Sequence, residues 1–203
     1  MNRRAMIKAS FLTPFALLAL ALGGCRAAAP AAPQRPPLEG ATIGGPFTLV
    51  DKTGAAVRWS DFAGKYRIVY FGYTFCPDAC PLDVGVLMRG FAAFDRARPD
   101  LGARVRPLFI SIDPERDTPA KVGEFAAAFS PRLIGLTGTP AQVAIAAKAF
   151  ATYYKRGTVS AGGYLMDHSR TAFLMDPAGK PIALLPIDAG PAAVSAELVK
   201  WVH

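Results

Sequence analysis

Residues 66–96 have the sequence YRIVYFGYTFCPDACPLDVGVLMRGFAAFDR, which places a strand, two cysteines and a helix in direct succession. Tyr66 to Gly72 are rich in aromatic and β-branched side chains, a composition that predicts a short central β-strand. Pro81 suits the first turn of a helix, and apolar residues then recur at helical spacing as far as about Arg96. We therefore expect the first strand and helix of a mainly parallel α/β sheet.

Strand and helix patterns alternate on both sides of this stretch. Thr139 is expected to cap a later helix that Pro140 opens. The order predicts an α/β protein with a thioredoxin-like fold, an N-terminal β-hairpin extension and inserted elements. The predicted elements are a hairpin over 47–59, strands at 105–112 and 133–136 with helices after about 119 and 140, a hairpin of 171–175 with 181–185, and a closing helix over 194–202.

The composition is that of a globular protein. Of 203 residues, 52% are hydrophobic and 19% are charged, which allows one ordinary core and rules out a disordered polymer. The formal charge of +8 falls to +5 without Arg3, Arg4 and Lys8, which leaves 20 basic against 15 acidic residues. Because the remaining arginines are scattered rather than clustered, nucleic-acid binding is disfavoured.

The N-terminus has the pattern of an export signal over residues 1–24, with basic residues before an apolar run too short for a permanent span. Leu22-Gly23-Gly24-Cys25 resembles the bacterial lipobox, which implies lipidation of Cys25; an ordinary signal that leaves a spare thiol is the alternative. Residues 25–40 form an Ala/Pro-rich tether, and 41–203 the folded domain. We expect a protein that is lipid-anchored at the cell membrane and faces the periplasm.

The two internal cysteines carry the chemistry. Cys76 and Cys80 are spaced Cys-x-x-x-Cys, and residues four apart on a helix lie about 5–6 Å apart, close enough to hold one metal ion. A disulfide needs modest rearrangement. The N–H groups of a helix start are expected to lower the pKa of both thiols. The pair is therefore suited to metal or redox work.

His168 directly precedes the predicted strand that begins at Thr171. If that strand runs antiparallel beside Tyr66–Phe71, His168 arrives next to Cys76 and Cys80. Two thiolates and one imidazole suit Cu(I), whereas structural zinc wants four ligands. The alternatives are a purely structural disulfide and a loop histidine that is unconnected with the thiols.

Three motifs resemble one family. FGYTFCPDACP at 71–81, SIDPERDTP at 111–119, and Asp167-His168-Ser169 followed by FLMD at 173–176 and Gly179 are similar to the SCO/SenC copper-binding proteins of cytochrome c oxidase assembly. The resemblance implies a thioredoxin-like fold in which Cys76, Cys80 and His168 bind one copper ion. It also implies delivery of copper, or of electrons, to the dinuclear copper site of oxidase subunit II. Phe173 departs from a tyrosine common in the family, and Cys25 replaces a transmembrane anchor.

Neighbouring residues have more ordinary interpretations. Residues 113–119 are expected to form a turn and helix cap at the rim of the site, with partner recognition as the alternative. Asp167 is a candidate acceptor that orients His168. Met166 and Met175 are expected near the site, mainly as core residues, with Met166 a minor candidate for a transient copper contact. The terminal His203 is not expected to be a ligand.

Three functions are compatible with these residues. The first is a metallochaperone without catalytic turnover, which takes Cu(I), with Cu(II) as the alternative, from a periplasmic copper donor. The second is a thiol-disulfide reductase that maintains the oxidase cysteines through the redox-active pair Cys76 and Cys80 and has no need of His168. The third and weakest is a peroxidase of the peroxiredoxin type, in which Asp-His-Ser has no clear task.

Overall fold

The computed structural model describes residues 34–159 and 163–203, and residues 35–203 form one compact unit. The signal segment, Cys25 and the tether as far as residue 33 lie outside the described residues. The elements are β1 (Thr48–Val50), β2 (Ala56–Arg58), η1 (Trp59–Phe62), β3 (Tyr66–Gly72), α1 (Ala79–Ala97), α2 (Pro99–Gly102), β4 (Val105–Ser111), α3 (Pro119–Phe129), β5 (Ile134–Leu136), α4 (Pro140–Ala149), β6 (Tyr154–Arg156), β7 (Met166–His168), β8 (Ala172–Met175), β9 (Pro181–Leu185), η2 (Ile187–Ala189) and α5 (Pro191–Trp201).

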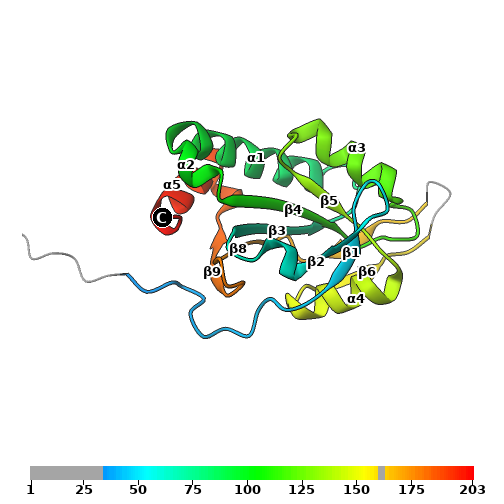
Figure 1. The fold of residues 1–203 in the computed structure, drawn as a ribbon. Helices are drawn as coiled ribbons and strands as arrows, with labels where there is room; N and C mark the ends of the chain where they lie inside the picture. The colour runs from blue at the N-terminus through cyan, green and yellow to red at the C-terminus, as the bar shows by residue number, and fades with distance from the viewer. Residues whose placement is uncertain (1–33, 160–162) are drawn as a thin grey trace, which may run out of the picture. The chain divides into compact units, whose positions relative to one another are not determined.

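The central sheet has five strands in the order β5-β4-β3-β8-β9 (Figure 1). Strands β3, β4 and β5 run parallel, and β8 runs antiparallel to both β3 and β9. Tyr70 in β3 lies opposite Ala172 in β8, which confirms the predicted antiparallel partner. The C-terminal end of β3 therefore lies beside the N-terminal end of β8, so the cysteine segment and the histidine segment meet at one edge.

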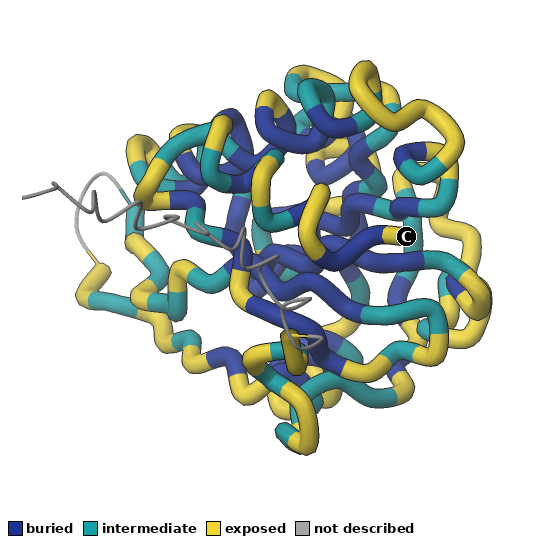
Figure 2. The backbone as a smooth tube through the Cα atoms, turned by 90° about the vertical axis from the view of Figure 1, so that its left-hand side faces the viewer, coloured by how far each residue is buried: buried dark blue, intermediate teal, exposed yellow. Residues whose placement is uncertain are grey.

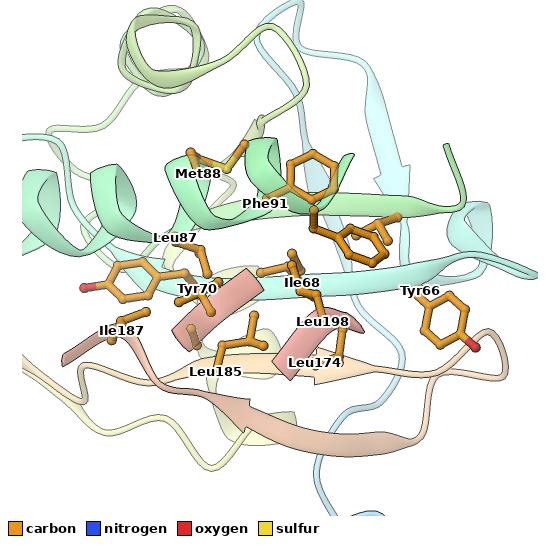
Figure 3. Packing of buried hydrophobic residues seen from close by; sticks show 14 of the residues in the cluster. Tyr66, Ile68, Tyr70, Leu87, Met88, Phe91, Leu174, Leu185, Ile187 and Leu198 are labelled. Atoms are coloured by element: carbon orange, nitrogen blue, oxygen red, sulfur yellow. The ribbon is translucent and has the colours of Figure 1, made fainter. Parts of the chain in front are cut away.

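Strand β3 is buried along its whole length because both faces of the sheet are covered. Ile68 and Tyr70 belong to a hydrophobic cluster with Leu87 of α1 and Leu198 of α5 (Figure 3). Gly90 lets these two helices approach closely, since a Cβ at this position would lie 2.6 Å from Cβ of Val194. Helix α1, which carries Cys80, is thereby held firmly against the sheet.

The opposite face carries a second cluster. Val69 and Phe71 pack there with residues of α4 and of the β1-β2 hairpin. Phe71 and Phe150 have ring centroids 5.4 Å apart. Figure 1 shows α1 and α3 on one side of the sheet and α4 on the other, and the strands between them are largely buried in Figure 2. The alternation of side chains along β3 thus builds two cores.

Local sequence signals set the helix starts. Thr139 caps α4 by accepting a hydrogen bond from the Gln142 N–H, and the Gln142 side chain accepts one from the Thr139 N–H in return. Thr118 caps α3 in the same way, with its hydroxyl accepting from the Lys121 N–H. Prolines occupy the first turns of α3, α4 and α5. The predicted Thr139 cap is confirmed.

Two strands near the candidate site were not predicted. Strands β6 and β7 form a separate two-stranded antiparallel sheet in which Tyr154 lies opposite His168. His168 is therefore the last residue of a strand, not part of a simple loop before β8. Within residues 34–159 and 163–203, no helix is long and apolar enough to cross a membrane.

Candidate metal centre

The two thiols lie at the junction of β3 and α1. Cys76 is in the connecting segment and half-buried, whereas Cys80 is the second residue of α1 and fully buried. Both are free thiols. The Cys80 N–H donates to the Cys76 Sγ at 3.3 Å. The start of α1 thus points a backbone donor at the outer sulfur. Because Cys76 precedes α1, the two cysteines do not share one helical turn, contrary to the expectation from their spacing.

His168 brings the third donor from the far end of the sequence. Its Nε2 lies 3.3 Å from the Cys80 Sγ, and its Nδ1 lies 3.0 Å from the Ser169 carbonyl oxygen. Because a carbonyl can only accept, Nδ1 carries the proton and the lone pair of Nε2 faces the thiol. Burial lowers the pKa of His168 and favours the neutral ring. A neutral imidazole with a free Nε2 is suited to ligate a metal.

Two tyrosine rings enclose His168. Tyr70 and Tyr73 meet its ring edge-on, with centroids 6.4 Å and 5.9 Å away. Burial is the main cause that raises the pKa of Tyr73 to about 12, so the phenol stays protonated at neutral pH. These rings restrict the orientation of the imidazole and exclude water from its inner side.

The environments of the thiols differ, and this corrects the expectation that the helix start lowers both pKa values. Burial raises the pKa of the Cys80 thiol. Burial also opposes ionisation of Cys76, but hydrogen bonds from the Cys80 and Asp78 N–H groups outweigh it, and the pKa of Cys76 is lowered. The outer thiol therefore ionises at lower pH than the inner one.

Asp117 supports the cysteine segment from below. This fully buried carboxylate accepts hydrogen bonds from the Thr74 N–H at 2.9 Å and from the Thr74 hydroxyl at 2.6 Å. It also accepts one from the Ser111 hydroxyl at 2.6 Å. The predicted turn over residues 113–119 therefore supports the rim of the site. Its Asp117 holds Thr74, which lies two positions before Cys76 in the sequence.

An open pocket of about 920 Å³ lies beside Cys76. Arg116 stacks on Tyr164 at 3.6 Å from the ring centroid and donates to Asp113. Arg156 pairs with Glu115 on the outer rim. Several lining side chains are basic or aromatic: Phe75, Arg116, Lys155, Arg156 and Tyr164.

Four secondary candidates are not brought into contact with the metal-binding atoms. Asp167 is exposed, and the Ser169 carbonyl takes its expected role of orienting His168. Met166 is half-buried in β7 and packs against the second cluster. Met175 lies opposite Arg67, near the other end of β3 from the cysteines, so its expected position near the site is wrong. The carbonyl of His203 accepts from Tyr66, also at that far end.

Asp83 and Arg170 were missed by sequence reasoning. Asp83 is buried on α1, one turn beyond Cys80, and Arg170 donates to it with two nitrogens. The available signal was a charge on the apolar face of the helix, next to Val84 and Leu87. Over the described residues, no three His, Cys, Asp or Glu side chains already form a metal-binding group, so ligation by Cys76, Cys80 and His168 stays a prediction.

Comparison with known proteins gives both a matching family model and sequence relatives. The family model described as SCO1/SenC matches residues 35–203. Protein SenC of Rhodobacter capsulatus is 47% identical over 137 residues, which are 68% of this chain and 60% of that protein. The chain therefore spans less than two thirds of this relative's length.

Solved structures give the same answer for the fold. The copper-bound structure of Bradyrhizobium japonicum ScoI is 36% identical, with a TM-score of 0.71, over 79% of this chain and 99% of that one. The thioredoxin domain of a thiol-disulfide oxidoreductase from Bacteroides vulgatus is 20% identical, with a TM-score of 0.53, over 79% of this chain and 96% of that one. The predicted thioredoxin-like fold is confirmed.

Proposed function

Because the chain belongs to the SCO1/SenC family, we propose that it is a copper metallochaperone whose cargo is one Cu(I) ion. The ligands in this proposal are Cys76 Sγ, Cys80 Sγ and His168 Nε2. Sulfur and imidazole donors suit Cu(I), which accepts low coordination numbers. The residues therefore fit the ion that the family resemblance implies.

One observation carries the proposal: the lone pair of His168 Nε2 faces Cys80 Sγ at 3.3 Å while Nδ1 is held by the Ser169 carbonyl. A histidine ligand needs its second nitrogen engaged so that the first is oriented and free. A loop histidine without a metal role has no need of either constraint. The copper found in ScoI, which is 36% identical, supports copper as the cargo.

Loading the site requires the thiols to give up their protons. Cys76 has a lowered pKa and ionises readily, whereas Cys80, with a raised pKa, holds its proton until a competing cation displaces it. Cys76 is also the partly exposed thiol, next to the open pocket. We infer that a donor or acceptor protein exchanges copper first at Cys76.

The sequence motifs supply the partners and the location in this proposal. The acceptor is the dinuclear copper site of cytochrome c oxidase subunit II, and a periplasmic copper donor supplies the metal. The chain is held at the membrane by a lipid on Cys25, with residues 41–203 facing the periplasm.

Copper stoichiometry tests the proposal directly. The whole chain is reduced, loaded with Cu(I) under argon in mild detergent, and washed with a chelator that removes loosely bound metal. We expect one copper per chain for the wild type and for Cys25→Ser, and almost none for Cys76→Ala/Cys80→Ala. Equal retention by the double variant would refute this site.

Thiol-disulfide exchange is a second candidate, favoured by the unequal thiols. The Cys76 thiolate attacks a target disulfide, forming a mixed disulfide and releasing one target thiolate. Cys80 then loses its proton to His168 Nε2 and attacks the Cys76 sulfur. This step forms the Cys76–Cys80 disulfide and releases the second target thiol. Two electrons pass to the target. In this candidate the 3.3 Å contact gives His168 a task that the sequence analysis did not assign to it.

The redox state of the target cysteines distinguishes the metallochaperone from the reductase. A metallochaperone transfers Cu(I) to a target peptide whose cysteines are already reduced, and a reductase acts only on an oxidised target, without copper. We expect transfer to the reduced peptide. Rapid reduction of the oxidised peptide combined with no copper transfer would favour the reductase.

A further inference from the structure

An ion pair between a buried carboxylate and a partly exposed arginine lies next to the candidate metal centre. Asp83 in α1 is only 4% exposed. Arg170 donates to its Oδ2 through Nε at 2.8 Å and to its Oδ1 through Nη2 at 2.5 Å. The Tyr70 hydroxyl donates to the same Oδ2 at 2.8 Å. A buried carboxylate with this many donors is costly to disrupt, because any lost partner leaves a charge without compensation.

Asp83 and Arg170 each lie close in sequence to one of the proposed ligands. Asp83 lies one helical turn after Cys80, and Arg170 lies two residues after His168. The ion pair therefore joins the helix that carries one proposed ligand to the segment that carries another. Tyr70 adds β3 to the same junction, and its ring meets the His168 ring edge-on at 6.4 Å.

Other contacts tie the connection between β7 and β8 to elements other than α1. Ser169 is bonded to Tyr153, through its N–H to the carbonyl at 2.9 Å and through its hydroxyl to the N–H at 3.2 Å. The ladder between β8 and β3 begins only at Ala172. Arg170 is the residue of this short connection whose side chain reaches α1. It is thus placed to set the distance between His168 and Cys80.

We propose that Asp83 and Arg170 are positioning residues, a two-pronged clamp that holds the His168 ring with Nε2 toward Cys80 before any copper arrives. The inference rests on the proposed function for its purpose, but the clamp itself is a property of the copper-free protein. A planar guanidinium that binds a carboxylate with two nitrogens fixes both distance and angle, which a lysine cannot do. Preorganisation of this kind stabilises a bound metal through its ligands.

Asp188 offers an internal comparison. It approaches Arg170 Nη2 at 3.6 Å from the solvent side and is 86% exposed. An exposed pair of this kind contributes little. Asp95 and Arg132 supply a second comparison, because they form an ion pair at the other end of α1 with two contacts of 3.1 and 3.2 Å. Neither control touches His168 or the cysteines.

The experiment uses the whole reduced chain in mild detergent and two measurements. The first is the nitrogen spectrum of the histidine rings without copper, which is simple because the chain has two histidines and His203→Gln assigns them. We expect one Nδ1-protonated form of His168 in the wild type, and a mixture of tautomers in Arg170→Gln and Arg170→Lys. The second is Cu(I) affinity in competition with a chromophoric chelator, which we expect to fall about tenfold in both variants.

Asp188→Asn and Asp95→Asn should behave as the wild type in both measurements. The Tyr70 hydroxyl still donates to Asp83 in both Arg170 variants, and the Arg170 side chain is itself 48% exposed, so these variants should fold even where Asp83→Asn does not. Where Asp83→Asn folds, combining it with Arg170→Gln should cost no more affinity than either change alone, because both remove one contact.

The results distinguish the clamp from the proposed function. A wild-type tautomer in both Arg170 variants, with Cu(I) affinity within about twofold of the controls, would overturn the clamp. A wild type that binds no Cu(I), combined with altered ring tautomers in the Arg170 variants, would overturn the metallochaperone and leave the clamp standing.

Discussion

His168 Nε2 lies 3.3 Å from Cys80 Sγ, although 88 positions separate the two residues in the chain. The contact forms because β8 runs antiparallel to β3, so the start of one strand meets the end of the other. It places a neutral imidazole lone pair against a protonated thiol, the copper-free form of the proposed site.

Replacement of His168 tests its role as a ligand. We expect His168→Ala to weaken Cu(I) binding more than about 100-fold, because outer partners of metal ligands alone account for 10- to 100-fold. Chelator competition on the reduced chain measures the loss. His203→Ala is the matched control, since it removes the other histidine at the far end of the sheet. Unchanged affinity in His168→Ala would remove the histidine from the site.

The unequal thiols predict selective alkylation. A lowered pKa keeps Cys76 as thiolate to lower pH, whereas burial raises the pKa of Cys80 and keeps it protonated and shielded. In a short iodoacetamide pulse at about pH 8, Cys76 should react well ahead of Cys80, and its rate should fall only when the pH drops through its own lowered pKa. Peptide mass spectrometry resolves the sites. Equal labelling in the folded chain would contradict the assignment, and unfolding in urea should equalise the rates.

Asp117 should contribute strongly to stability because it is a buried hydrogen-bond acceptor. Replacing this buried acceptor in Asp117→Asn should lower the free energy of unfolding by about 3 kcal/mol, because an amide cannot satisfy all three donors. Asp51 is a close control: it accepts from the Thr53 N–H and hydroxyl at 2.8 and 2.6 Å, but at the surface. Asp51→Asn should cost less than about 1 kcal/mol. Urea titration compares the two, and equal losses would show that burial is not the deciding factor.

Two glycines of α1 should respond in opposite ways to alanine. In Gly90→Ala the new methyl group would collide with Val194 of α5, and we expect a loss of about 1–3 kcal/mol. In Gly85→Ala the nearest atom is the flexible end of Arg89 at 3.2 Å, so the gain in helix propensity should make the change neutral or stabilising by up to about 1 kcal/mol. Thermal unfolding measures both. A stabilising Gly90→Ala would mean that the α1–α5 contact is looser than described.

The proposed lipid anchor can be tested by replacing Cys25. Cys25→Ser should release the protein from membranes, because the apolar run before it is too short to serve as a permanent span. Fractionation after a salt wash measures the membrane-bound share, with Cys76→Ser as the control that keeps the anchor. If Cys25→Ser stays bound to the same extent, another feature holds the chain at the membrane.

Local patterns determined most of the secondary structure. Strand β3, helix α1 and the Thr139 cap follow from β-branched runs, helical spacing and cap chemistry, which act between residues close in sequence. The cysteine spacing and the family motifs also identified the candidate ligands in advance. Strands β6 and β7 escaped prediction because their residues are mostly polar and none is fully buried, and because they pair with each other.

Only the tertiary structure decided the pKa shifts of the two cysteines and the orientation of His168. Both cysteines lie near the start of one helix, yet their pKa values move in opposite directions. Burial raises the pKa of Cys80, whereas hydrogen bonds from the Cys80 and Asp78 N–H groups outweigh burial at Cys76 and lower its pKa. The Ser169 carbonyl engages Nδ1 of His168, and an ion pair joins α1 to the β7–β8 connection. Burial and long-range pairing depend on which surfaces meet after folding, and no pattern within a short window of sequence specifies them.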